Sequence, residues 1–317
     1  MPVCCGRHIY RATTLLVFAV MLNVACAQQY AFDLSTPSAL QEFFRYRGDS
    51  TRIISGHRGS HIAGYPENAI ETFDYVLQQV PAFFEVDPRL TKDSVIVLLH
   101  DASLDRTTNG SGLLKDHTWE DVKRLKLKDA NGQLTSFRIP TLQEAIEWAR
   151  GKTVLNLDKK DVPLPMIADL IRKNSADAFV MVTVHNTEQA LFYYRNNPNQ
   201  MMSAHIKTDS AFVAFEASGL PWKNMIAYIG PGFSDINRRL PSLLHQRSVM
   251  FMISAAPSVD KWPTKEKRAA GYNEIFLRGA DILESDFPIE VAEAVRPSYR
   301  LRPTSSPNTK EAAEPMR

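Results

Sequence analysis

The side chains best suited to catalysis stand where short apolar runs of this sequence end. Each run has the length and composition of a β-strand, and the runs that end at His57, Asp87, His100, Asp158 and Asp286 finish in charge or imidazole. Successive strand residues alternate faces, so Glu85 and Asp87 point to one side, as do Asp158 and Lys160. If the strands are parallel, their carboxyl ends converge on one face and can form a single site. The residues concerned are His57, Arg58, Glu85, Asp87, His100, Asp158, Lys160 and Asp286.

Three of these residues predict a metal site. Glu85, Asp87 and Asp158 offer hard carboxylate oxygens, which suit Mg²⁺ or Ca²⁺ better than zinc. Several acids inside a barrel mouth are costly without a compensating charge. We therefore expect one divalent cation, Ca²⁺ or Mg²⁺, as the cofactor. The opposing interpretation is that these residues are charged only because strand ends meet solvent. Solvent exposure can explain a single charged residue, but it explains less well why so many charged residues and histidines lie at these strand ends.

The remaining residues indicate chemistry at a phosphate ester. His57 and His100 suit acid and base roles near neutral pH. Arg58 and Lys160 suit an anionic substrate, and the planar guanidinium favours phosphate. Together with a cation, these groups predict metal-assisted displacement at phosphorus. The sequence contains no Walker-type loop and no G-x-G-x-x-G, G-x-S-x-G or H-E-x-x-H motif.

Strand-like runs that alternate with helical patterns must position these residues. This alternation predicts a parallel α/β fold, and a TIM (β/α)8 barrel fits the length best. Nine runs compete for eight positions, so Met201–Ile206 and Met225–Gly230 either share one position or include an extra strand. The runs are Arg52–His57, Phe83–Asp87, Val95–His100, Thr153–Asp158, Phe179–Val184, Met201–Ile206, Met225–Gly230, Val249–Ser254 and Asp281–Asp286.

The predicted barrel domain covers residues 50–295, and one segment within it departs from the alternation of strand-like and helical patterns. Residues about 103–140 carry turn signals and only a short helical piece, which predicts a small inserted subdomain after the third strand run. Thr141 and Glu144 then form a capping box that begins a helix. Residues 296–317 are rich in Pro, Ser, Thr and charge, which predicts a disordered tail.

The N-terminal segment predicts an exported protein. Arg7 and Arg11 precede an apolar run that is too short to span a bilayer, and Ala25-Cys26-Ala27 has the small-x-small pattern of a signal-peptidase site. We therefore expect residues 1–27 to be a cleaved signal peptide and the protein to be periplasmic or secreted, without a stable membrane span. Lipid anchoring at Cys26 is the less favoured alternative. The three cysteines are Cys4, Cys5 and Cys26, so the body has no thiol for a disulfide or zinc site.

The charge balance argues against nucleic acid as a partner. The chain of 317 residues has 37 Lys and Arg against 35 Asp and Glu, with a net charge of +2. The basic excess lies near the termini, and residues 28–295 carry 30 basic against 33 acidic side chains. Binding to a phosphate backbone requires a basic surface. A small-molecule substrate is the better expectation.

Several short motifs, taken in order, resemble those of the glycerophosphodiester phosphodiesterase family. The similarity covers roughly residues 50–295, and an ordered set is far more specific than any single motif. The motifs are Gly56-His57-Arg58-Gly59, Pro66-Glu67-Asn68, Glu85-Val86-Asp87, His100-Asp101, Leu104-Asp105-Arg106-Thr107-Thr108, Ile139-Pro140-Thr141-Leu142, Asn156-Leu157-Asp158-Lys159-Lys160 and Ser285-Asp286-Phe287-Pro288.

The resemblance implies a metal-dependent barrel enzyme that cleaves glycerophosphodiesters to sn-glycerol 3-phosphate and an alcohol through a cyclic phosphate. By this resemblance the three carboxylates bind the metal, His57 and His100 act as acid and base, and Arg58 and Lys160 bind the phosphate. Residues expected to support the site are Glu67, Asn68, His185 and Asp286.

Among the departures from the family pattern, one concerns the metal site and another the substrate pocket. The ligand on the fourth-strand motif is usually Glu, and Asp158 is one methylene shorter. The family's Trp-Thr is absent near Met252. One alternative is a phospholipase D-like lyase that converts lysophospholipid or sphingomyelin to a cyclic phosphate. Another is a barrel that binds phosphodiesters without turnover.

Overall fold

The computed structural model describes residues 1, 30–32, 34–296 and 300–301. The predicted signal peptide and most of the predicted tail therefore lie outside the described residues. Within that tail, Arg300–Leu301 form strand β13, which pairs in parallel with Thr51 and Arg52. None of the helices in the described part of the chain combines the length and apolar character needed to cross a bilayer.

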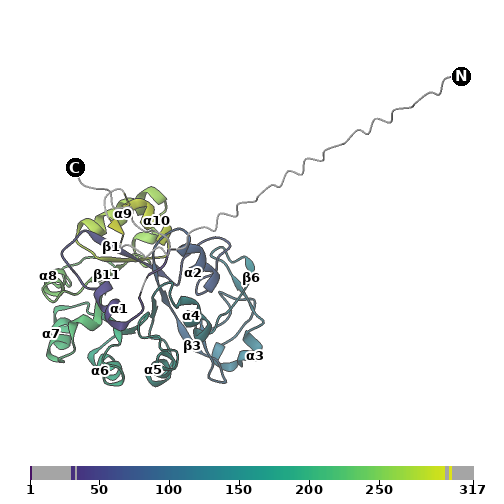
Figure 1. Cartoon of the computed structure of the whole chain (residues 1–317), viewed down its shortest axis with the longest axis horizontal. Helices are drawn as coiled ribbons and strands as arrows, with labels where there is room; N and C mark the ends of the chain where they lie inside the picture. The colour runs from purple at the N-terminus through teal and green to yellow at the C-terminus, as the bar shows by residue number, and fades with distance from the viewer. Residues whose placement is uncertain (2–29, 33, 297–299, 302–317) are drawn as a thin grey trace.

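Eight parallel strands close into a barrel, which confirms the predicted TIM fold (Figure 1). The first strand pairs with the last, with Ile53 opposite Ile282, so the ring has no open edge. In ring order the strands are β1 (Thr51–His57), β2 (Phe83–Val86), β7 (Leu155–Leu157), β8 (Val180–Val184), β9 (Met201–His205), β10 (Met225–Gly230), β11 (Phe251–Ser254) and β12 (Ile282–Ser285).

Helices follow the strands and form the outer layer. The predicted capping box is present, because the Thr141 side chain accepts from the Glu144 amide and Glu144 accepts in return from the Thr141 amide. Short 3₁₀ helices precede β10 and α9, namely η2 (Trp222–Asn224) and η3 (Val259–Lys261). The outer helices are α2 (Ile70–Leu77), α4 (Leu142–Ala149), α5 (Leu164–Lys173), α6 (Thr187–Asn196), α7 (Asp209–Ala217), α8 (Leu240–His245), α9 (Lys265–Leu277) and α10 (Pro288–Val295).

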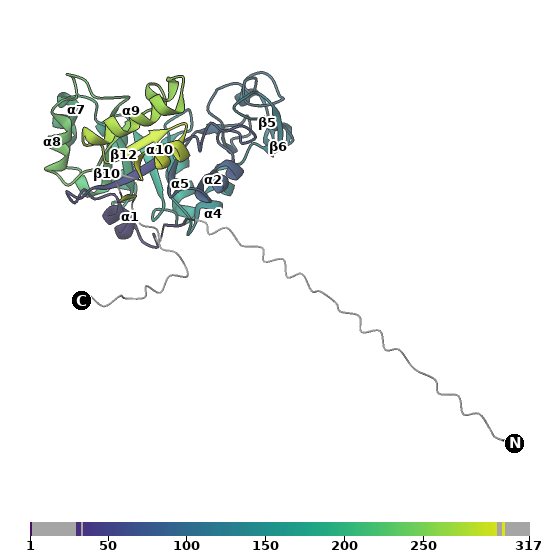
Figure 2. The ribbon, with the colours of Figure 1, turned by 90° about the horizontal axis from the view of Figure 1, so that it is seen from above.

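The two-residue period of the strands separates the barrel into an apolar floor and a polar mouth. Outward-facing residues such as Ile54 and Leu155 pack against the helices in the main core. Inward-facing residues near the strand starts, such as Phe83 and Met181, form a second apolar cluster inside the barrel. Helix α1 (Pro37–Phe43) closes this end by packing against that cluster. Figure 2 shows α1 at one end of the barrel and the β5–β6 pair at the other.

The run Val95–His100 is not a barrel strand, which corrects one expectation. Its central part, β4 (Ile96–Leu98), pairs antiparallel with β3 (Pro88–Leu90) outside the ring. The run is apolar because Leu98 joins the main core while Val97 and Leu99 pack against the inserted segment, residues 103–140. Both Met201–His205 and Met225–Gly230 are therefore barrel strands, and the inserted segment follows the second barrel strand. It contains η1 (Leu114–Asp116), α3 (Trp119–Val122), β5 (Lys126–Lys128) and β6 (Leu134–Arg138).

Candidate active site

A pocket of about 510 Å³ opens at the carboxyl ends of the barrel strands. Each of the eight strands, or the residue that directly follows it, contributes at least one wall residue. The inserted segment adds Arg106, and η3 adds Lys261. This is the face at which TIM barrels build their sites, and the pocket volume falls in the usual range for small-molecule ligands.

The three predicted carboxylates meet at this pocket, where Glu85 and Asp158 form part of the wall and Asp87 is fully buried. Glu85, Asp87 and Asp158 each offer one oxygen, and these oxygens lie within 4.8 Å of one another. Burial, followed by the charges of Asp87 and Asp158, raises the pKa of Glu85 well above its usual range. The protein groups around the cluster do not fully compensate its negative charge, and a bound divalent cation would supply the missing positive charge.

Asp87 is fully buried and is held by two neighbours. Asn68 Nδ2 donates to Asp87 Oδ2 over 2.7 Å, and the Asp87 amide donates to Asn68 Oδ1 over 3.1 Å. Lys160 Nζ lies 3.0 Å from Asp87 Oδ1 and 2.6 Å from Asp158 Oδ2. Burial favours the neutral acid, but the cations Lys160 and Arg58 outweigh it and lower the pKa of Asp87. Among the described residues Oδ1 still has no hydrogen-bond partner of good geometry, so this oxygen can accept a further ligand.

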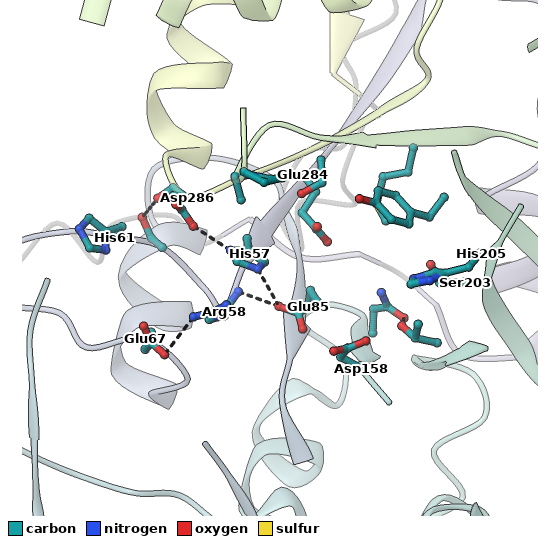
Figure 3. Close-up of a pocket in the computed structure, with 18 of the residues that line it drawn as sticks. His57, Arg58, His61, Glu67, Glu85, Asp158, Ser203, His205, Glu284 and Asp286 are labelled. Atoms are coloured by element: carbon teal, nitrogen blue, oxygen red, sulfur yellow. Dashed lines mark hydrogen bonds and ion pairs between the residues drawn. The ribbon is translucent and has the colours of Figure 1, made fainter. Parts of the chain in front are cut away.

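Arg58 is placed by an unusual backbone conformation. Its φ of 52° lies in the left-handed region, at a cost of about 1–2 kcal/mol for a residue with a side chain. The turn directs the Arg58 amide to Glu85 Oε2, 3.0 Å away, and the side chain lies 3.3 Å from Glu67 Oε1. Figure 3 shows Arg58 between these two carboxylates at the edge of the pocket. The strain therefore occurs where the chain turns toward the acidic cluster.

His57 is oriented by a carboxylate from the opposite end of the chain. Its Nδ1 lies 2.7 Å from Asp286 Oδ1, which leaves Nε2 toward the pocket, 4.0 Å from Glu85 Oε2 (Figure 3). Burial opposes a charged ring, but the hydrogen bond to Asp286 and the charge of Glu284 outweigh it and raise the pKa of His57. Lys261 Nζ holds the other Asp286 oxygen at 3.2 Å.

His100 is oriented in a similar way but lies outside the pocket walls. Its Nδ1 is 2.7 Å from Asp101 Oδ1, and its side chain is one-third exposed. Arg106 donates to Asp101 and, over 2.7 and 2.8 Å, to both oxygens of Glu67. Glu67 also contacts Arg58, so the inserted segment links His100 to the pocket through a continuous chain of charges. Burial lowers the pKa of His100, and the bond to Asp101 offsets this only in part.

Comparison with known proteins places this barrel in a family. Residues 57–218 match the glycerophosphoryl diester phosphodiesterase family. A glycerophosphoryl diester phosphodiesterase from Parabacteroides distasonis is 49% identical over 88% of this chain and 98% of that chain, with a TM-score of 0.85. The chain belongs to the glycerophosphoryl diester phosphodiesterase family.

More distant proteins are similar to this chain in sequence or in fold. A glycerophosphodiester phosphodiesterase of Bacillus subtilis is 26% identical over 225 residues, which cover 63% of this chain and 75% of that protein. An Oleispira antarctica phosphodiesterase, solved with the product sn-glycerol-3-phosphate, shares the fold at a TM-score of 0.58 and 22% identity, over 78% of this chain and 97% of that chain.

His185 lies beside the phosphodiesterase pocket and is not one of its walls. Its ring stacks on His205 with centroids 4.3 Å apart, and His205, which does line the pocket, packs against Tyr228 at 4.9 Å. His185, which the sequence indicated as a supporting residue, is not a wall residue, whereas His205 and Tyr228, which were not among the predicted residues, line the pocket. Both lie on the inward face of a strand run, where a polar or aromatic residue in an otherwise apolar run is the available signal.

The sequence analysis also missed two acids of this phosphodiesterase site. Glu284 lines the pocket and is two residues before Asp286, so the two-residue period of β12 points both inward. Asp260 lies in η3 and accepts a hydrogen bond of 2.6 Å from the Asp286 amide. No strand pattern identifies Asp260, because its role depends on how a loop folds over the barrel mouth.

Proposed function

We propose that this protein hydrolyses glycerophosphodiesters to sn-glycerol 3-phosphate and an alcohol. The observation that carries the proposal is the meeting of Glu85, Asp87 and Asp158 within 4.8 Å, in the mouth of a barrel of this family. The similarity to the Parabacteroides distasonis phosphodiesterase over nearly the whole of that chain supports the reaction class.

One divalent cation, Ca²⁺ or Mg²⁺, would be held by Glu85, Asp87 and Asp158. The donor set fits, because all three ligands are hard oxygens and Asp87 Oδ1 is buried without a hydrogen-bond partner among the described residues. When bound, the cation supplies positive charge against the phosphate oxygens. Lys160 bridges Asp87 and Asp158, so it keeps the two acids together and adds a second positive charge at the same edge.

His57 and His100 would transfer the protons. Each ring has its Nδ1 bound to a carboxylate, Asp286 or Asp101, and this arrangement leaves Nε2 as the exchanging nitrogen. One ring takes the proton of the free glycerol hydroxyl as that oxygen attacks phosphorus, and the other protonates the alcohol oxygen that leaves. Water then opens the resulting cyclic phosphate. Arg58 stabilises the charge on the phosphate oxygens.

The proposal is tested with a panel of glycerophosphocholine, glycerophosphoethanolamine, glycerophosphoinositol and glycerophosphoglycerol, with and without chelator. We expect sn-glycerol 3-phosphate as the phosphorus product, loss of turnover on chelation, and recovery with Ca²⁺ or Mg²⁺. Full activity after exhaustive chelation would contradict the metal role. A cyclic phosphate formed from lysophospholipid or sphingomyelin as the main product would favour the lyase, and binding without turnover would favour a non-catalytic barrel.

The role of the His57 imidazole is tested by substitution. His57→Ala should lower kcat by about 10²–10⁴-fold, the range for loss of a positioned acid or base. The matched variant is His117→Ala, because His117 lies in the inserted segment and its Nε2 contacts only the Ser111 carbonyl at 3.1 Å. Wild-type turnover by the His57 variant would remove this residue from the mechanism.

We further propose that the protein is exported after cleavage near Ala27, with lipid attachment to Cys26 as the less favoured alternative. The test is the N-terminal sequence and intact mass of the mature protein. A retained N-terminus would contradict export through this segment, and a mass increase of a diacylglyceryl group would identify Cys26 as lipidated.

A further inference from the structure

One side of the pocket mouth carries positive charge that the proposed reaction does not use. His185, His205 and Tyr228 stand at one level on three neighbouring strands, because Val184 pairs with Ala204 and His205 with Tyr228. Lys207 follows β9 and places its ammonium 4.8 Å from the centre of the Tyr228 ring. Lys159, which follows Asp158, adds a second positive charge that acts on His185, and its Nζ donates to the Lys160 carbonyl. We call these five residues the basic rim.

The β9 part of the basic rim, His205 and Lys207, lies across the barrel from His57 and Arg58, whereas Lys159 follows β7 beside Asp158. In the ring order β9 is four strands away from β1, which carries His57 and leads into Arg58. Figure 3 shows His205 on the far side of the pocket from Arg58. A substrate whose phosphodiester sits by Arg58 would therefore extend its remaining part toward the basic rim.

The two lysines are not neutralised by acids. Among the described residues, neither Lys207 nor Lys159 has a carboxylate within 4 Å. The nearby acids have other partners, since Asp158 pairs with Lys160 at 2.6 Å and Asp209 with Arg239 at 3.0 Å. Burial lowers the pKa of His185; the charge of Asp158 opposes this shift, and the charges of Lys207 and Lys159 add to it.

The aromatic ring of Tyr228 in the basic rim already contacts the Lys207 ammonium. A choline group is normally recognised by aromatic rings that contact the quaternary ammonium. Here the ammonium of Lys207 lies over Tyr228, and burial together with His185 and Lys207 lowers the pKa of His205 to about 3, so that its ring is neutral near pH 7. The rim thus offers neutral donors and ammonium groups that no carboxylate among the described residues neutralises, rather than an aromatic cage.

We propose that the basic rim binds an anionic group on the alcohol half of the substrate. This inference rests on the proposed function. The glycerol phosphate half has no charge besides the phosphodiester itself, so a second anion must come from the alcohol, as a further phosphate or as a carboxylate. Glycerophosphodiesters with such alcohols are the preferred substrate class, and Lys207 is the specificity-determining residue.

The test compares three substrates that share the same glycerol phosphate half. Bis(glycerophospho)glycerol carries a second phosphate, glycerophosphoserine carries a carboxylate beside an ammonium, and glycerophosphocholine carries a cation alone. The variants are Lys207→Met and Lys207→Glu. The control is Lys223→Met, because Lys223 is an exposed lysine of η2 at the other end of the barrel.

In Lys207→Met the ratio of kcat/KM for the anionic substrates to that for glycerophosphocholine should fall by about three- to tenfold, between the effect of an exposed ion pair and that of a partly desolvated one. Lys207→Glu should lower the ratio further, and Lys223→Met should not change it. Added salt should lower the wild-type ratio as well. A loss confined to bis(glycerophospho)glycerol would identify a second phosphate as the ligand, and one confined to glycerophosphoserine would identify a carboxylate.

A ratio that stays within twofold in Lys207→Glu would overturn the inference, as would a wild-type enzyme that prefers glycerophosphocholine tenfold over both anionic substrates. Failure of the proposed function looks different, since the wild type would then turn over none of the three substrates.

Discussion

Asp260 is a buried acid whose removal should affect both stability and catalysis. It is 5% exposed and accepts hydrogen bonds from three donors, one of which, the Ser285 hydroxyl, lies within reach of both oxygens. Its Oδ1 accepts from Tyr272 Oη at 2.7 Å and from Ser285 Oγ at 2.9 Å. Its Oδ2 accepts from Ser285 Oγ at 3.0 Å and from the Asp286 amide at 2.6 Å. Asp260 therefore fixes the backbone from which Asp286 orients His57.

Asp260→Asn keeps the shape of the side chain and removes its charge. The amide oxygen can accept from the Asp286 amide if the new NH2 group faces Tyr272 Oη and Ser285 Oγ, because these hydroxyls can turn to accept. The variant still loses the charge-assisted hydrogen bonds of the carboxylate, so we expect the free energy of unfolding to fall by about 2 kcal/mol. Because the Asp286 backbone is then held less firmly, kcat should fall about tenfold, with a smaller change in KM.

Urea unfolding and steady-state kinetics measure the two effects. Tyr272→Phe removes one hydrogen bond and leaves the Asp286 amide paired, so it should cost about 1–2 kcal/mol of stability with kcat near the wild-type value. Asp235→Asn, at a side chain that is 96% exposed, should change stability by less than about 0.5 kcal/mol. An Asp260→Asn variant that loses stability but keeps full kcat would refute the positioning role, and one that loses neither would refute the whole argument.

Three further predictions concern other parts of the structure. Arg106→Met should lower kcat by about three- to tenfold, because Asp101, which orients His100, loses its guanidinium partner. At this half-exposed position the substitution should lower the free energy of unfolding by less than about 1 kcal/mol. An unchanged kcat would show that His100 does not depend on Arg106. Burial, then the charges of His185 and Lys207, lowers the folded-state pKa of His205 to about 3, whereas the unfolded chain binds this proton near pH 6.5, so the free energy of unfolding falls as the pH drops below 6.5. Between pH 7 and pH 4.5 the His205→Gln variant should therefore lose roughly 2 kcal/mol less of this free energy than the wild type. Equal losses in the two proteins, measured by urea unfolding at both pH values, would contradict this. Gly56→Ala would place a methyl group 2.3 Å from a backbone oxygen, so it should cost about 3 kcal/mol or yield insoluble protein, and normal yield and stability would show that the turn can relax.

Much of the site could be predicted because strand geometry is visible in a sequence. Glu85 and Asp158 end apolar runs, and parallel strands bring such ends together whatever the intervening chain does. The same reasoning applies to Glu284, which was overlooked because Asp286 two residues later already ended the run. A strict two-residue count along each strand run would have included it.

Other features depend on contacts that the sequence does not display. Val95–Leu99 resembles a buried parallel strand because it is apolar on both sides, but one side faces the inserted segment rather than the barrel. Asp260 lies in a loop with no periodic pattern, and its burial arises only when η3 packs over Ser285. His100 appeared to be a barrel residue for the same reason that Val95–Leu99 appeared to be a barrel strand.

The hydrogen bond between His57 and Asp286 joins positions that are 229 residues apart in the chain. Because these residues lie on the first and last barrel strands, the imidazole acquires its partner only when the ring of strands is sealed. A ribosome-bound chain that still lacks β12 cannot assemble this pair, and proteolytic removal of the last β/α unit would abolish it at once. The gain of turnover during refolding should accordingly track the slowest, most non-local step of assembly rather than the earlier collapse of the helices.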